Sequence, residues 1–132
     1  MHKVFVYGSL LSGMGNNALL KDAKFLGKAT TTPGFQMMDI GWFPGVVEDP
    51  SGITIHGEVY EVSDETLARL DRLEGFRVCD PENGLYNRKN IETSFGEAII
   101  YIYNNHLGRD KNFVTSGNWR LYYNRKTGIS IT

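Results

Sequence analysis

The chain lacks most of the features that would mark a cross-linked or membrane-bound protein. Its 132 residues include one cysteine, which excludes an internal disulfide and fits a reducing compartment. No apolar run is long enough for a membrane span or for the apolar region of a signal peptide. Neither sign of charge dominates, since 14 Lys and Arg stand against 15 Asp and Glu. Nucleic acid and anionic membranes are therefore not expected partners, and we predict a cytoplasmic protein.

Signatures of metal and cysteine chemistry are also missing. The three histidines, His2, His56 and His106, have no helical i, i+4 partner and no cysteine or carboxylate at metal-ligand spacing. Cys79 precedes Asp80 in an acidic segment, which disfavours its thiolate. We therefore expect no metal site and no cysteine nucleophile.

One glycine pattern imitates a cofactor site. Gly13, Gly15 and Ala18 have the spacing of a dinucleotide fingerprint, and Asp39 lies at a suitable distance beyond them. However, Gly8 has already ended the preceding apolar run, and the helix that would follow is short. We therefore predict that the protein uses no nucleotide and no other cofactor.

The residues that are present predict a single α+β domain over residues 1–132. Fifteen glycines and only four prolines suit a strand-rich fold with many turns. The expected strands are 4–7, several short ones within 24–48, then 53–62, 86–93 and 98–103, and the expected helices are 18–23 and 63–75, with a single helical turn in 116–123 followed by a tail. This pattern favours a mixed barrel or curled sheet of five to six strands with two or more short helices, not alternating βαβ units.

The predicted helix at 63–75 has an unusual end. Ser63 is a good N-cap, Leu67 and Leu70 form an apolar stripe, and Gly75 is a natural stop. The next position on that stripe is Glu74. Burial and the helix dipole would both raise the pKa of its carboxyl towards the range that proton transfer at pH 7 requires. The alternative is that Glu74 is simply solvated.

A second carboxylate lies near this candidate. Asp71 is three residues before Glu74, so the two side chains could be neighbours on the helix. We expect Asp71 to face Arg69, Arg72 or solvent, and to take no part in the chemistry.

The apolar run at 4–7 predicts a strand buried on both faces. It breaks at Gly8 and Ser9, where successive backbone N–H groups can hold an anion. A plain strand-to-helix turn is the alternative. Ser9 lacks the Gly-x-Ser-x-Gly context of a nucleophile, so we interpret it as a hydrogen-bonding side chain.

Five motifs occur in an order that resembles the γ-glutamylcyclotransferase-like family. They are Val-Phe-Val-Tyr-Gly-Ser-Leu at 4–10, Gly-Glu-Val-Tyr-Glu-Val at 57–62, Leu-Asp-Arg-Leu-Glu-Gly at 70–75, Tyr-Asn-Arg at 86–88, and the strand at 98–103. The short form of the chain is more similar to the γ-glutamylamine and bacterial or phage branch than to the glutathione-degrading branches.

The resemblance implies a small mixed barrel with a central cavity, in which one glutamate acts as acid and base. By position that catalytic residue is Glu74. The resemblance and the turn chemistry together give the candidate substrate-binding residues Tyr7, Gly8, Ser9, Leu10, Tyr86 and Tyr103. For the three tyrosines, packing within the barrel is the alternative role.

The family reaction releases an amine from a small γ-glutamyl amide as the substrate's own α-amine closes a ring, giving 5-oxoproline. It needs no metal or cofactor. A non-catalytic protein that binds a small ligand, and an interaction module with an unused pocket, remain alternatives. The loop at 11–17 lacks the basic residue often found there in the family, which leaves the departing amine undetermined.

Overall fold

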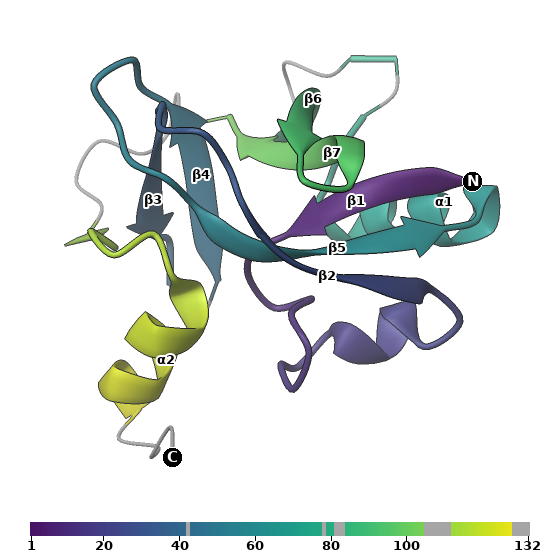
Figure 1. Ribbon diagram of the computed structural model, residues 1–132, viewed down its shortest axis with the longest axis horizontal. Helices are drawn as coiled ribbons and strands as arrows, with labels where there is room; N and C mark the ends of the chain where they lie inside the picture. The colour runs from purple at the N-terminus through teal and green to yellow at the C-terminus, as the bar shows by residue number, and fades with distance from the viewer. Residues whose placement is uncertain (42, 78, 81–83, 105–111, 128–132) are drawn as a thin grey trace.

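Two β-sheets form the framework of the protein, as the computed structural model shows (Figure 1). The structure describes residues 1–41, 43–77, 79–80, 84–104 and 112–127. The larger sheet has the order β2 (Lys24–Thr30), β5 (His56–Val62), β1 (His2–Val6), β7 (Gly96–Tyr103), β6 (Tyr86–Thr93). The smaller sheet has the order β4 (Pro44–Glu48), β3 (Phe35–Asp39), β8 (Asn112–Phe113). The predicted α+β class with mixed strands is confirmed.

Strand β1 occupies the centre of the larger sheet. It runs antiparallel to β5 and parallel to β7, where Val4 is opposite Ile99 and Phe5 is opposite Ile100. Val4 and Phe5 are completely buried. A central strand has a sheet neighbour on each side and a packed layer on each face, which is why its sequence is an unbroken apolar run.

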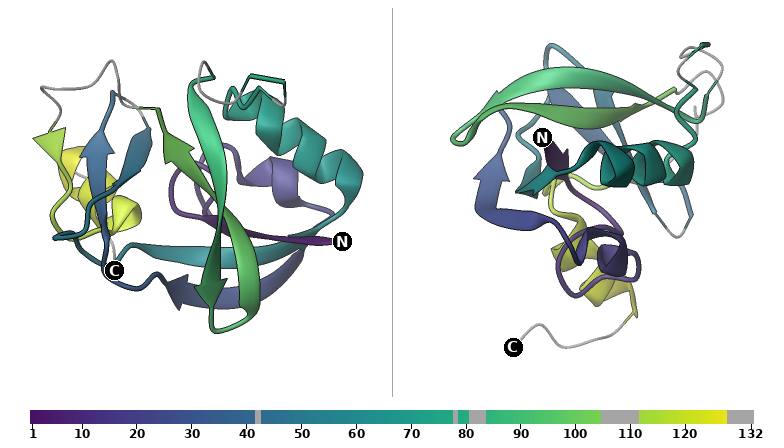
Figure 2. Two further views of the ribbon diagram at one scale, coloured as in Figure 1. Left: turned by 90° about the horizontal axis from the view of Figure 1, so that it is seen from above. Right: turned by 90° about the vertical axis from the view of Figure 1, so that its right-hand side faces the viewer.

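Among the described residues, three helices pack around the sheets: η1 (Asn17–Leu20), α1 (Asp64–Leu73) and α2 (Trp119–Thr127). Figure 2 shows α1 and η1 towards one end of the molecule, with the three-stranded sheet and α2 towards the other. Helix α1 has the predicted limits, because the Ser63 side chain accepts a hydrogen bond from the Thr66 backbone N–H and Gly75 follows at φ +64°. In the described part of the chain, no helix has both the length and the apolar character needed to cross a bilayer.

The structure departs from the predicted elements in three places. The described residues form eight strands, because the segment 24–48 divides into three and a two-residue strand joins the smaller sheet. The helix expected at 18–23 is a 3₁₀ helix of four residues, and its N-cap Asn16 makes no side-chain capping bond. The expected single turn near the C-terminus is the nine-residue helix α2.

Helix α2 extends beyond its predicted turn because aromatic packing holds it. Trp119 is 1% exposed and lies against the rings of Tyr122 and Tyr123. Tyr122 also donates a hydrogen bond to Asp39 of β3, with 2.7 Å between the oxygens. The Tyr122–Asp39 bond joins residues 83 positions apart, so local sequence could not predict it. Residues 128–132 of the predicted tail lie outside the described residues.

The close approach of β5 to β1 gives a first prediction. A Cβ on Gly57 would lie 2.3 Å from the backbone oxygen of Val6 and 2.6 Å from the ring of Phe5. Because a backbone oxygen cannot rotate away, Gly57→Ala should lower the free energy of unfolding by about 2–3 kcal/mol, measured by urea denaturation. The control is Gly15→Ala, where nothing lies within 4 Å. Equal stability of the two variants would contradict this packing.

Candidate active site

A cavity of about 360 Å³ lies between the loop that follows β1, the C-terminal end of α1 and the start of β4. The described residues that line it are Phe5, Val6, Tyr7, Gly8, Ser9, Leu10, Asn16, Phe43, Pro44, Leu73, Glu74, Leu85, Tyr86 and Tyr101. Its volume lies within the range of small-molecule sites. Five of the six predicted substrate-binding residues and the predicted catalytic residue therefore share one cavity.

Glu74 is the only charged residue among the described residues of the cavity wall. It caps the C-terminus of α1, where its backbone N–H donates to the Leu70 carbonyl. Among the described residues, no group donates a hydrogen bond to its carboxyl. The ionised form has therefore lost water without gaining a partner, and burial raises its pKa to about 7. At neutral pH this group can both accept and donate a proton.

Tyr7 and Tyr86 line the same cavity as the glutamate and interact with its charge. The pKa of each is raised first by burial, and the negative charge of Glu74 raises it further. Both phenols therefore remain neutral. The Tyr7 hydroxyl donates to the backbone oxygen of Tyr101 at 2.6 Å, and the Tyr86 hydroxyl donates to that of Pro44. These hydroxyls hold the walls of the cavity together.

Tyr103 has a different position from the other two predicted tyrosines. It is absent from the described lining of the cavity, and its ring meets the ring of Tyr86 edge to face at 5.6 Å. In the sheet it lies directly opposite Tyr86, while Tyr101 is opposite Arg88. Tyr103 thus supports Tyr86 from behind, and Tyr101 is the tyrosine of β7 that reaches the cavity.

The loop after β1 faces the cavity with two unused backbone donors. Among the described residues, the N–H groups of Ser9 and Leu10 donate to no other group. Two asparagine side chains hold the loop in this form. Asn16 donates from its amide nitrogen to the Ser9 hydroxyl, and Asn17 donates to the Leu10 carbonyl, both at 2.9 Å. Free N–H groups held in this way are suited to a carboxylate or a developing oxyanion.

Gly8 allows this loop to lie against the smaller sheet. A Cβ at this position would lie 2.6 Å from Cγ of Pro44, the first residue of β4. The glycine that ends the first strand is therefore required by a close approach as well as by a turn. This contact closes one side of the cavity.

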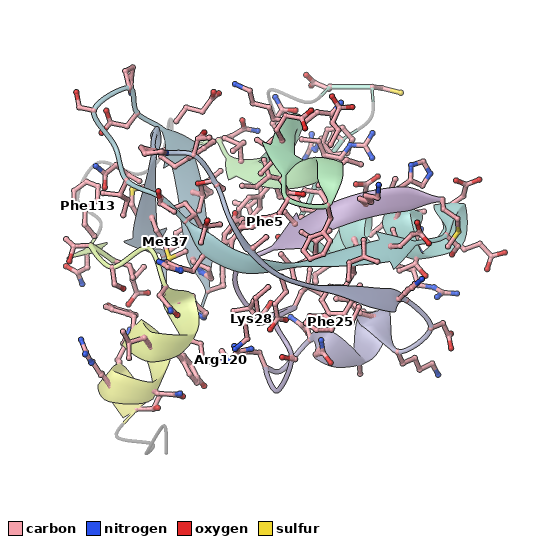
Figure 3. The ribbon with its side chains drawn as sticks, viewed as in Figure 1. Phe5, Phe25, Lys28, Met37, Phe113 and Arg120 are labelled. Atoms are coloured by element: carbon pink, nitrogen blue, oxygen red, sulfur yellow. The ribbon has the colours of Figure 1, made fainter. Side chains whose placement is uncertain are left out.

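A buried carboxylate that the sequence did not single out fixes the far end of the loop. Glu58 of β5 is 1% exposed and accepts hydrogen bonds from the N–H and the hydroxyl of Ser12, each at 2.8 Å. It also pairs with Arg120 of α2 at 3.2 Å, and Figure 3 shows Arg120 beside Lys28, below the sheet. Burial alone would raise the pKa of Glu58, but Ser12 and Arg120 outweigh it and hold that pKa below its usual value.

The direction predicted for the Asp71 side chain was wrong. Its carboxylate faces neither solvent nor the arginines of its own helix. It accepts from Arg88 of β6 at 3.1 Å and from the Tyr101 hydroxyl at 2.7 Å. These bonds tie the last turn of α1 to two strands and hold Tyr101 against the cavity. Asp71 is therefore a positioning residue beside Glu74.

Eight residues of the cavity wall were not predicted as site residues: Phe5, Val6, Asn16, Phe43, Pro44, Leu73, Leu85 and Tyr101. For Leu73, its position next to Glu74 at a helix end was an available indication. For Tyr101, only the strand register distinguishes it from Tyr103, which has the same side-chain direction two residues later. Phe43 and Leu85 lie outside regular elements, where periodicity carries no information.

Within the described part of the chain, no three His, Cys, Asp or Glu side chains are grouped so that they could hold a metal ion. His2 contacts Asp64 at the surface, with 2.5 Å between the nitrogen and the oxygen. His106 and residues 81–83 of the acidic segment lie outside the described residues.

Comparison with known proteins gives consistent matches. The sequence matches the family described as "Gamma-glutamyl cyclotransferase, AIG2-like" over residues 4–121. A Vibrio cholerae protein that is named provisionally as a γ-glutamylcyclotransferase is 42% identical over 118 residues, covering 89% of this chain and 95% of its own. The γ-L-glutamyl-butirosin B γ-glutamyl cyclotransferase of Niallia circulans is 32% identical over 126 residues. The match covers 95% of this chain and 69% of that protein. An uncharacterized Pyrococcus horikoshii protein of known structure superimposes with a TM-score of 0.77 at 26% identity, covering 97% of this chain and 98% of its own.

The Glu58 network predicts a specific loss of stability. Arg120→Leu would leave a buried carboxylate without its cation, so the free energy of unfolding should fall by about 2–3 kcal/mol, since Arg120 is itself partly exposed. Arg125→Leu removes an exposed arginine from the same helix and should change little. Adding Glu58→Gln to the Arg120 variant should restore part of the loss. Identical urea curves for the two arginine variants would contradict the network.

The pKa of Glu74 predicts how stability depends on pH. Its folded value of about 7 lies above the ordinary 4.5, so its contribution to stability is complete below pH 4.5 and is lost as pH rises through 7. Glu74→Gln should therefore match the parent protein near pH 4.5 and exceed it by about 2 kcal/mol at pH 8. This difference in the free energy of unfolding is smaller than the pKa shift alone implies, because the carboxyl is still partly in contact with solvent. An equal difference at both pH values, measured by chemical denaturation, would contradict the shift.

Proposed function

The chain belongs to the AIG2-like γ-glutamyl cyclotransferase family, and on that basis we propose that it releases an amine from a small γ-glutamyl amide by forming 5-oxoproline. Membership makes it a γ-glutamylcyclotransferase-like enzyme. The observation that supports the specific reaction is the shared cavity, in which a carboxyl with a pKa of about 7 accompanies two free backbone donors. The butirosin relative is named for a γ-glutamyl cyclotransferase activity, in agreement with this class of reaction.

The substrate must be folded before it can react. In a γ-glutamyl amide, the α-amine and the side-chain carbonyl belong to the same molecule, so a bound, bent conformer brings them to attack distance. The free N–H groups of Ser9 and Leu10 hold the α-carboxylate or the carbonyl oxygen at one end. The rings of Tyr7 and Tyr86 restrict the remaining space to the bent form.

Glu74 then carries the protons. Its carboxylate takes a proton from the α-ammonium group, and the freed amine attacks the γ-carbonyl carbon to form the new C–N bond. The protonated Glu74 returns that proton to the nitrogen of the departing amine as the original amide bond breaks. The ring nitrogen still carries a second proton, which Glu74 passes to the released amine. The products are therefore a lactam with a neutral ring nitrogen and an alkylammonium ion. A pKa near 7 suits both directions of transfer.

Negative charge develops on the carbonyl oxygen when the amine attacks. Fixed N–H donors stabilise this charge because they need no reorganisation during the step. The asparagine bonds to Ser9 and Leu10, and the anchorage of the same loop on Glu58, keep those donors in place. The mechanism assigns Glu74 the proton transfers and assigns the loop the binding of charge.

Replacing the carboxyl tests the proposal directly. Glu74→Gln keeps the shape of the side chain but removes its base, so 5-oxoproline release should fall by about 10²–10⁴-fold, followed by mass spectrometry with a γ-glutamyl amide. Glu65→Gln changes an exposed glutamate of the same helix and should retain activity. In the parent enzyme, kcat/KM should decrease as pH falls below 7. Full activity of Glu74→Gln would refute the assignment, and binding of amides by the parent protein without any turnover would favour the non-catalytic alternative.

A further inference from the structure

Exposed apolar side chains gather at the mouth of the cavity. The described residues include six large apolar side chains that are exposed, and three of them, Phe43, Leu73 and Leu85, line this cavity at 37%, 39% and 41% exposure. They come from three separate parts of the chain: the residue before β4, the last turn of α1 and the residue before β6. Apolar surface gathered around an opening indicates an apolar ligand group.

The polar groups of the cavity come from another segment of the chain. Ser9 and Asn16 belong to the loop after β1, together with the free backbone donors. A γ-glutamyl amide has one polar end, which carries the α-amine and α-carboxylate, and a second part that leaves as the amine. If the polar end binds this loop and presents its α-amine to Glu74, the leaving part extends towards the apolar mouth.

Among the described lining residues, a charged leaving part would find no counterpart beside the three apolar side chains. Apart from Glu74, the described lining contains no charged side chain. An anionic leaving part would therefore lose water without meeting a cation. A cationic one would compete with the α-amine for Glu74. Burial of an unpaired charge costs far more than burial of a methylene group gains.

From these observations we propose that the leaving amine is an uncharged, apolar alkyl or arylalkyl amine, bound by Phe43, Leu73 and Leu85. This inference rests on the proposed function, and it identifies the class of substrate. The amide bond lies beside Glu74, the glutamyl end lies against the loop, and the hydrocarbon covers the three exposed side chains at the mouth. Selectivity comes from the contrast between the polar loop and the three apolar side chains.

Three amides of nearly equal size test the proposal: γ-L-glutamyl-pentylamide, the 4-aminobutyl amide and the 3-carboxypropyl amide. They differ at the end of the chain in charge, but little in length. The pentylamide should have a kcat/KM for 5-oxoproline release that is on the order of 100-fold above either charged amide. Across ethyl, propyl, butyl and pentyl amides, kcat/KM should rise by about threefold per methylene. Equal rates for the three amides would overturn the proposal.

A matched pair of variants locates the effect. Leu85→Lys places a cation at the mouth, so it should lower kcat/KM for the pentylamide by about tenfold and raise it for the 3-carboxypropyl amide. Phe113→Lys adds the same charge at another exposed apolar position, which Figure 3 shows at the outer edge of the smaller sheet. It should leave the preference unchanged. Equal effects of both variants would mean that the mouth does not select the amine.

Binding separates this inference from the proposed reaction. Calorimetry with the Glu74→Gln variant measures affinity for the three amides without turnover. Tighter binding of the pentylamide, together with no 5-oxoproline from the parent enzyme, would support the apolar mouth and refute the reaction. Turnover of all three amides without preference would support the reaction and refute the apolar mouth. Neither turnover nor selective binding would refute both.

Discussion

The arrangement of the site depends on a carboxylate that does not face the cavity. Glu58 lies in β5 of the larger sheet, where an unpaired negative charge would be costly. Its two hydrogen bonds from Ser12 and its ion pair with Arg120 offset that cost. The same contacts join β5, the loop after β1 and α2. The loop that lines the cavity with Ser9 and Leu10 is thereby fixed at its other end to a buried charge. A network of this kind keeps the loop ordered without using any of the groups that line the cavity.

Two glutamates of this chain show how environment decides the use of one chemical group. Glu58 is more deeply buried than Glu74, yet its pKa is lowered, while that of Glu74 is raised to about 7. The difference lies in their partners. Ser12 and Arg120 donate hydrogen bonds to the Glu58 carboxylate, and among the described residues no group donates one to the Glu74 carboxyl. One carboxylate is thereby fixed in its ionised form as a structural anchor. The other is kept ready to change its protonation state.

The sequence predicted those features whose cause is local. The limits of α1, the position of Glu74 at its end and the buried strand β1 follow from capping residues, a stripe of leucines and an apolar run. The ordered motifs added the loop at Gly8–Leu10. What was missed depends on long-range contacts: Glu58 meets Arg120 across 62 residues, and Asp71 turns inward to Arg88 and Tyr101. No local pattern indicates which of several arginines a carboxylate will meet, or which of two tyrosines on one strand face reaches a cavity.

The central position of β1 determines when the site can exist during folding. Its neighbours in the sheet are β5 and β7, which come much later in the sequence, and its partner Ile99 lies 95 residues after Val4. Closing such a long loop is slow, since the entropy of closure is lost before the contacts form. Until β7 docks, one edge of β1 has no pairing strand, and the loop that follows β1 begins from a strand that is not yet held in place. Ordering of the loop after β1 is therefore a late event, coupled to completion of the sheet.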